Sequence, residues 1–438
     1  MLEDLSKLYF EHRNMPRGDM KSFDSSAHQT NDETRKNRTA QAEVTVLKAD
    51  NTPLVRQEVV ISQTNHKFLF GIAGFDIVDA NGNVSGEEKE LVDRRVDKLT
   101  DLFNYVTLPF YWGRFEPQRG HPMTTSLMKA ARWCVDHHLL VKGHPLCWHT
   151  LTPDWLLSMS NADILQTQVT RIQREVGGFR GLINNWDVIN EAVIMPIFDK
   201  YDNGITRIGK ELGRIKTIKP MFEAARAANP KAILLLNDFD VSPAFDILVE
   251  GCLEAGIQID AVGIQSHMHQ GYWGVEKTMQ VLEHFSRFNL PIHFTETTLV
   301  SGQLMAPEIV DLNDYQVADW PTTPEGEDRQ VREVILHYKT LLSQPLVAGI
   351  TWWDLSDGNW LNAPGGLIRK DGSRKPAYDA LIGLVKGDWW LAPTRLDTDG
   401  DGRVHFTGFL GEYELLYEGE RHHFMLDAVG TSKIEIHL

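Results

Sequence analysis

The segment LINNWDVINE, residues 182–191, decides the fold. Its apolar residues run through Val188 and Ile189, and it ends in a carboxamide and a carboxylate, Asn190 and Glu191. A short apolar run of this kind predicts a buried strand. Further apolar runs predict seven more strands, at 68–74, 105–110, 139–145, 232–238, 259–267, 291–297 and 347–354.

Helix-like stretches separate most of these strands. They lie at 124–138, 161–177, 207–228, 244–256, 274–288 and 327–344. Eight strands alternating with helices over about 300 residues are typical of a (β/α)8 TIM barrel. The rival fold is an open, doubly wound sheet, which favours a glycine-rich turn after the first strand. That turn reads GIAGFDIVD, residues 71–79, which fits poorly, so we predict an α/β barrel over 68–388.

The two ends of the chain differ from the barrel region. Residues 1–40 are polar, and we expect a peripheral extension there. Residues 41–67 read as two strands around a turn, and residues 389–438 are rich in strand patterns separated by glycine turns. We predict that these two regions pair to form a small β-rich appendage.

Composition and charge limit the possible partners. Hydrophobic residues make up 42% of the 438 positions and charged residues 24%, which is ordinary globular composition. The formal net charge of −16 argues against nucleic acid and against an anionic membrane surface, because both favour a basic face. A neutral or cationic substrate fits this charge. The sequence leaves the oligomeric state open.

Cysteine usage and the N-terminal residues bear on location. Cys134, Cys147 and Cys252 are odd in number and far apart, so they predict neither a disulfide framework nor a CxxC motif. The first 20 residues are charged and lack the apolar core of a secretory signal, and no apolar run reaches the roughly 20 residues of a membrane span. We expect a cytoplasmic protein for the chain as given, or a secreted or periplasmic one whose export signal has been removed.

Polar residues at the strand ends indicate the chemistry. In a closed barrel the active site lies at the C-terminal rim. The fourth strand ends in Glu191 and the seventh in Glu296. A single glutamate at a strand end is usually a solvated surface residue, but two on facing strands can cleave a glycosidic bond. One protonates the leaving oxygen while the other attacks the anomeric carbon or guides water to it.

Several motifs carry a family resemblance. They are KGHPLCWH (142–149), WDVINE (186–191), GIQSHMH (263–269), HFTET (293–297), ITWWDLSDGNW (350–360) and KPAY (375–378). In this order, over about 65–388, the sequence resembles glycoside hydrolase family 10, the xylanase-type barrels. The resemblance implies a retaining enzyme of the endo-1,4-β-xylanase type that cleaves β-1,4-xylosidic bonds in xylan or xylo-oligosaccharides. The alternative is a retaining hydrolase of another β-linked glycan, or exo action on short or decorated chains.

The same resemblance implies roles for individual residues. By motif position, Glu191 is the acid/base and Glu296 is the nucleophile, with their carboxyl groups about 5–5.5 Å apart. Asn190 is implied to hold the sugar 2-hydroxyl, and His267 to keep Glu296 charged. The full set implied to bind substrate or support the carboxylates is His144, Trp148, Asn190, Gln265, His267, Trp353 and Trp360.

One stretch departs from the family pattern. After its second strand the family carries Glu-Asn and Lys residues that grip the glycone sugars, but this sequence reads VTLPFYWGRFEPQRG (106–120). Tyr111, Trp112 and Arg114 occupy the place of those residues, and we expect them to contact the glycone. The long segment at 301–327 is a candidate cap over the cleft.

Two rival functions compete with this interpretation. A metal-dependent hydrolase could use four histidines, His144, His149, His267 and His269. Such barrels carry an HxH pair at the end of the first strand, which here reads GIAGFD, so we expect neither a metal nor an organic cofactor. A non-catalytic sugar-binding protein would keep the tryptophans but would not need both carboxylates. In the tail, DTDGDG (397–402) begins like a calcium loop, but Gly408 stands where an acid is required, so we expect a hairpin turn.

Overall fold

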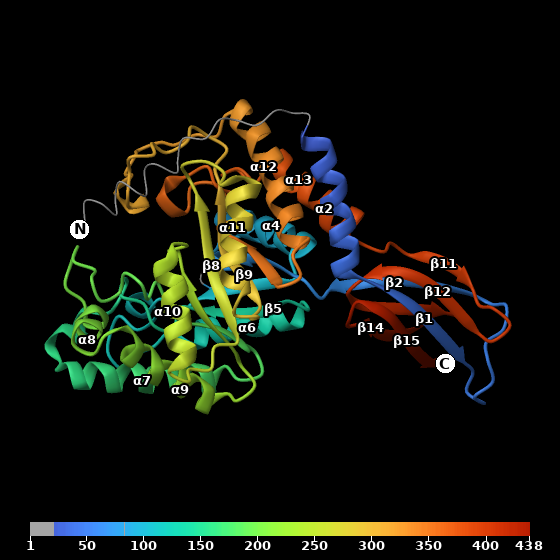
Figure 1. Ribbon diagram of the computed structural model, residues 1–438, viewed down its shortest axis with the longest axis horizontal. Helices are drawn as coiled ribbons and strands as arrows, with labels where there is room; N and C mark the ends of the chain where they lie inside the picture. The colour runs from blue at the N-terminus through green and yellow to red at the C-terminus, as the bar shows by residue number, and fades with distance from the viewer. Residues whose placement is uncertain (1–21, 83) are drawn as a thin grey trace.

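The computed structural model describes residues 22–82 and 84–438, so the first 21 residues of the expected polar extension lie outside it. Eight strands form a closed parallel barrel in the order β10-β3-β4-β5-β6-β7-β8-β9 (Figure 1). Their bounds are β3 Leu69–Ala73, β4 Tyr105–Pro109, β5 Leu140–His144, β6 Asn185–Asn190, β7 Ile233–Asp238, β8 Ala261–Met268, β9 Ile292–Leu299 and β10 Val347–Trp352. The predicted TIM barrel is therefore confirmed.

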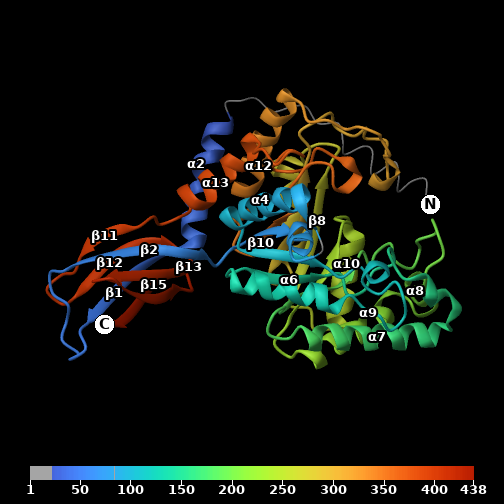
Figure 2. The same cartoon turned by 180° about the vertical axis from the view of Figure 1, so that it is seen from behind.

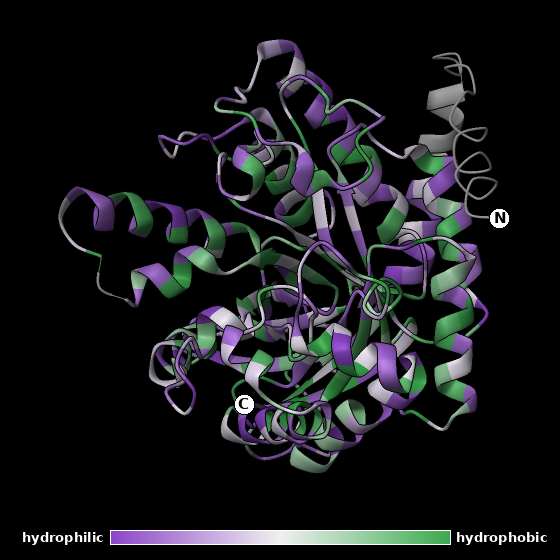
Figure 3. Ribbon diagram, turned by 90° about the vertical axis from the view of Figure 1, so that its left-hand side faces the viewer, coloured by the Kyte–Doolittle hydropathy of each residue, from purple (hydrophilic) through white to green (hydrophobic). Residues whose placement is uncertain are grey.

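Helices surround this barrel. Their bounds are α3 Phe75–Ala80, α4 Gly86–Leu102, α5 Trp112–Phe115, α6 Thr124–Asp136, α7 Asn161–Gly178, α8 Gly204–Leu212, α9 Arg214–Ala228, α10 Pro243–Glu254, α11 Gly274–Ser286, α12 Pro324–Leu342 and α13 Pro376–Gly383. Figure 3 shows hydrophilic and hydrophobic residues alternating along the outer helices. This pattern buries one stripe of each helix against the sheet. The predicted helix at 207–228 is two helices, α8 and α9, which meet at Gly213 with a φ of 76°.

The strand order decides which side chains can meet. β6 and β9 are separated by β7 and β8 on one side of the ring and by β5, β4, β3 and β10 on the other. Because all eight strands run parallel, their C-terminal ends form a single rim. Glu191 and Glu296 therefore lie at the same rim of the barrel, on strands that face one another.

The β appendage consists of two sheets built from both ends of the chain. One has the order β12-β1-β15 and the other β11-β2-β13-β14. Bounds are β1 Thr39–Leu47, β2 Glu58–His66, β11 Thr394–Asp397, β12 Arg403–Phe409, β13 Gly411–Tyr417, β14 Glu420–Leu426 and β15 Gly430–His437. The expected pairing of N- and C-terminal segments is confirmed. The expected hairpin at 397–402 is wrong, because β11 and β12 lie in different sheets. In Figure 1 this appendage lies at the right of the molecule, away from the loop that precedes α12.

Helix α2, Ser22–Arg38, joins the appendage to the barrel (Figure 2). The Arg38 guanidinium donates hydrogen bonds to the carbonyl oxygens of Leu342 (2.8 Å) and Val347 (2.6 Å), and to that of Gln344. The end of the predicted polar extension is thus hydrogen-bonded to the barrel through Arg38.

Candidate active site

Glu191 follows β6 directly and has a strained backbone. Its φ is 57°, in the left-handed region that non-glycine residues rarely adopt, and such strain is typical of functional positions. Its Oε2 accepts a hydrogen bond from Trp148 Nε1 at 2.7 Å. Its Oε1 accepts bonds from Gln265 Nε2 at 3.3 Å and from Asn190 Nδ2 at 3.2 Å. The carboxyl group is therefore held in one orientation by three neighbours.

The surroundings of Glu191 favour its protonated form. Burial is the largest cause, and the negative charges of Asp238 and Glu296 add to it, so that the pKa of Glu191 rises to about 8 despite the opposing hydrogen bond from Trp148. A carboxyl group that stays protonated at neutral pH can donate a proton to a leaving oxygen.

Glu296 lies within β9 and is almost fully buried. Its Oε2 is 3.1 Å from Nε2 of His267, and its Oε1 accepts a hydrogen bond from Asn237 Nδ2 at 3.0 Å. His144 Nε2 lies 3.7 Å from the same Oε1. Every polar neighbour named here can therefore donate to this carboxylate.

This environment favours the ionised form of Glu296. Burial by itself would raise its pKa, but the electrostatic influence of His144 and the hydrogen bond from His267 outweigh burial. The pKa of Glu296 consequently lies below its ordinary value. An ionised, poorly solvated carboxylate can act as a nucleophile toward an anomeric carbon.

A buried ion pair orients His144. Asp187 Oδ2 accepts a hydrogen bond from Lys142 Nζ at 2.7 Å and lies 2.7 Å from His144 Nδ1. All three side chains are buried. The second ring nitrogen of His144, Nε2, is thereby directed at Glu296 and lies 3.7 Å from its Oε1.

The fifth barrel strand supplies two site residues that the sequence interpretation missed. At the end of β7, Asn237 Nδ2 donates both to Asn190 Oδ1 at 2.6 Å and to Glu296. The adjacent Asp238 is fully buried and accepts the backbone N–H of Val193 at 2.9 Å. The run 232–238 ends in Asn-Asp, so the strand-end pattern that found Glu191 could have found both residues as well.

Aromatic side chains form a wall beside the two carboxylates. Trp353 lies 5.4 Å from His144 and 6.1 Å from His267, between ring centroids. Tyr111 packs 5.7 Å from Trp148. The buried members are Tyr111 and Trp353, and the partly buried ones are Phe75, Trp148 and Trp360. Phe75, which follows the first strand directly, was not predicted.

The second-strand loop places its three predicted glycone contacts, Tyr111, Trp112 and Arg114, in different surroundings. Arg114 is exposed, and its guanidinium lies 5.9 Å from the centre of the Tyr111 ring. Trp112 does not belong to the aromatic wall. Its Nε1 donates to Glu116 at 3.2 Å, and its ring packs 5.5 Å from Trp155 inside the hydrophobic core. The expected glycone contact by Trp112 is therefore corrected to a structural role.

Across residues 22–82 and 84–438, no three histidine, cysteine, aspartate or glutamate side chains come together as ligands for a metal ion. The four histidines of the metal hypothesis are thus not a ligand cluster. In the same part of the chain, no helix combines the length and apolar character that crossing a membrane requires.

Comparison with known proteins agrees with this geometry. The model of Glycosyl hydrolase family 10 matches residues 65–384. This chain belongs to glycosyl hydrolase family 10. Its family segment thus comprises all eight barrel strands and both rim glutamates.

Relatives of this family 10 chain are distant. Endo-1,4-beta-xylanase C of Paenibacillus barcinonensis is 25% identical over 78% of this chain and 34% of its own length. Endo-1,4-beta-xylanase A of Cellvibrio japonicus is 29% identical over 60% of this chain and 47% of its own length. The chain thus spans less than half of either relative. A thermostable mutant of a xylanase from Cellvibrio japonicus has a similar structure, with a TM-score of 0.59, 25% identity, and coverage of 73% of this chain and 98% of that one.

Proposed function

We propose that this chain hydrolyses β-1,4-xylosidic bonds with retention of configuration, by double displacement. One observation carries the proposal: at a single barrel rim, the partly buried Glu191 and the buried Glu296 have pKa values shifted in opposite directions. Such a pair divides the roles of acid and nucleophile. Xylan is the substrate class because relatives in the family are named endo-1,4-beta-xylanases.

The proposed reaction has two steps. Glu296 attacks the anomeric carbon while Glu191 protonates the leaving oxygen, which gives a covalent glycosyl-enzyme. Glu191, now ionised, takes a proton from water, and that water displaces Glu296. Asn190 is held by Asn237 and Gln265, so its amide is positioned to bond the sugar hydroxyl next to the reacting carbon. Trp353 and Tyr111 offer ring faces and edges to the glycone.

The test is product analysis on linear xylo-oligosaccharides and on arabinosylated or glucuronosylated xylan. Proton NMR of the first product should show the β anomer before mutarotation. A first product in the α configuration would overturn the retaining mechanism. Faster hydrolysis of β-1,4-glucan or β-1,4-mannan oligosaccharides would instead favour the alternative substrate class.

A further inference from the structure

The loop between β9 and α12, residues 300–323, lies beside the rim of the barrel (Figure 1). Val300, Met305 and Trp320 form a separate buried apolar cluster with Ala363 of the β10–α13 loop. Trp320 also donates its Nε1 hydrogen to the carbonyl oxygen of Gln303 at 2.8 Å. The base of the segment is therefore packed like a small core rather than a free loop.

This segment is anchored to the end of β8. The backbone N–H of Met305 donates to the carbonyl oxygen of His269 at 2.9 Å. The side chain of Gln270 donates to the carbonyl oxygens of Ala306 (2.9 Å) and Ile309 (2.7 Å). The segment thus leaves β9 and runs over the neighbouring strand, β8.

The tip of the segment then reaches the loop that follows β6. Lys200 Nζ lies 2.7 Å from Asp311 Oδ2 and 2.6 Å from Asp314 Oδ1. We call these three side chains the clasp. Lys200 is two positions after Phe198, whose ring packs 4.6 Å from His149, and His149 Nε2 is 3.9 Å from Glu191 Oε2. One side of the clasp therefore belongs to the loop that carries the catalytic acid.

The clasp joins the two halves of the candidate active site above the rim. Glu191 follows β6 and Glu296 lies in β9, and only β7 and β8 separate these strands on this side of the ring. The clasp connects the loops after β6 and β9, so it spans the ends of β7 and β8. The opposite side, toward β5, β4, β3 and β10, carries the aromatic wall and is spanned by neither partner of the clasp.

We propose that the clasp closes the leaving-group side of the cleft and makes this chain prefer short xylo-oligosaccharides over polymeric xylan. This proposal rests on the proposed function. Glu191 protonates the leaving oxygen, so the leaving chain departs past the loop that carries Lys200. In this proposal a polymeric leaving group must continue past the clasp, whereas a short leaving group need not reach it.

The clasp is weak enough to be opened by substitution or by salt. Lys200 is 42% exposed and Asp314 is 66% exposed. Ion pairs between exposed side chains contribute little and are screened by salt. Breaking the clasp should therefore leave the fold intact, because the packed base of the segment does not depend on it.

The test compares kcat/KM on linear xylan with kcat/KM on xylotriose. Lys200→Glu should raise this polymer-to-trimer ratio about three- to tenfold, since the new charge repels Asp311 and Asp314. The double variant Lys200→Glu with Asp311→Lys should restore part of the wild-type ratio. Lys210→Glu, at an exposed position on α8, makes the same change of charge away from the clasp and should leave the ratio unchanged.

Hydrogen exchange adds a readout that does not depend on turnover. Peptides covering 308–316 should exchange faster in Lys200→Glu than in the wild type. An unchanged ratio with faster exchange would overturn the role of the clasp in selectivity, and an unchanged exchange rate would overturn the clasp itself. A wild-type protein that cleaves neither substrate would instead overturn the proposed function. Equal kcat/KM values of the wild type on xylan and on xylotriose would overturn only the preference for short substrates.

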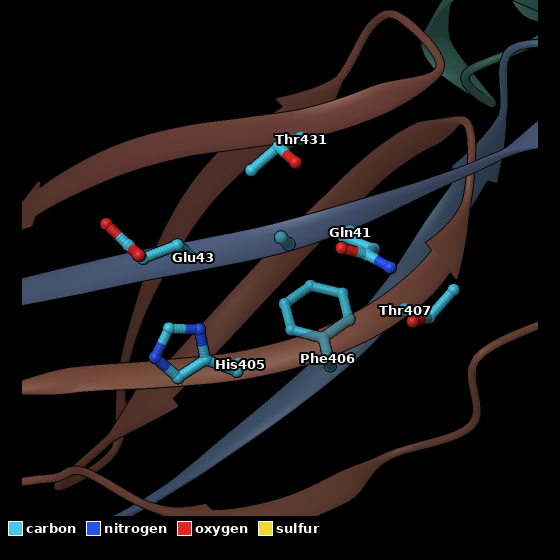
Figure 4. Close-up of a pocket in the computed structure, with 7 residues that line it drawn as sticks. Gln41, Glu43, His405, Phe406, Thr407 and Thr431 are labelled. Carbon is cyan, nitrogen blue, oxygen red and sulfur yellow. The ribbon is translucent and has the colours of Figure 1, made fainter.

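The appendage also has a polar face, on the β12-β1-β15 sheet. A hollow of about 420 Å³ lies on this sheet. Its lining includes the polar side chains of Gln41, Glu43 and His405 (Figure 4). Nothing in the described residues indicates what would cover this face.

Discussion

Two glutamates, one directly after β6 and one within β9, lie in opposite electrostatic environments. Glu191 lies near two other carboxyl groups, those of Asp238 and Glu296, and its pKa is raised to about 8. Glu296 lies between two histidines, and its pKa is lowered. Burial raises the pKa of both glutamates, so burial does not explain why their pKa values shift in opposite directions. The charged and hydrogen-bonding neighbours favour a protonated Glu191 and an ionised Glu296, as the proposed roles of acid and nucleophile require.

The largest effect should come from removing the nucleophile. Glu296→Ala should lower kcat on xylotriose by roughly 10⁴–10⁶-fold, because no covalent intermediate can form. Glu283→Ala, an exposed change of the same kind on α11, should have no effect. Circular dichroism should show that both variants are folded. A loss below a hundredfold in Glu296→Ala would contradict the assignment of the nucleophile.

Removing the acid should have a smaller effect that depends on the leaving group. Glu191→Ala should lower kcat/KM on xylotriose by roughly 10²–10⁴-fold, the usual contribution of a general acid. On 2,4-dinitrophenyl β-xylobioside the loss of kcat/KM should be far smaller, because that leaving group departs without a proton. Equal losses on both substrates would show that Glu191 does not act as the acid in bond cleavage.

The smallest effect should be a shift of the pH profile. Glu191 works when protonated, so wild-type kcat/KM should fall as the pH rises through about 8. Glu296 works when ionised, and its lowered pKa places the acid limb below the ordinary glutamate value of about 4.3. Asp238→Asn removes a negative charge beside Glu191, which lowers the pKa of that group and moves the alkaline limb to lower pH.

A matched change sharpens this last test. Asp379→Asn alters an exposed carboxylate on α13 and should leave both limbs in place. If Asp238→Asn moved neither limb, the charge of Asp238 would not contribute to the raised pKa of Glu191, which contradicts its role in the β6 environment.

The barrel was predictable because its strands are buried on both faces. Continuous apolar runs such as 232–238 and 259–267 stand out between helical stretches, and the observed β7 and β8 begin within two residues of them. Boundaries within polar helices were harder, since the joint at Gly213 interrupts a continuous helical pattern. The structural role of Trp112 was not predictable, because an aromatic residue at a rim loop can turn toward the cleft or toward the core.

The sequence by itself determined the eight-strand barrel and the two rim glutamates, because strand burial and strand-end polarity are local patterns along the chain. Although the family resemblance implied that His267 keeps Glu296 charged, only the tertiary structure decided the full set of neighbours that shift the pKa values of Glu191 and Glu296, since they come from β5, β7 and β8. It also decided the clasp, whose partners Lys200 and Asp314 are 114 positions apart. Charge interactions act through space, so their partners cannot be read from spacing along the chain.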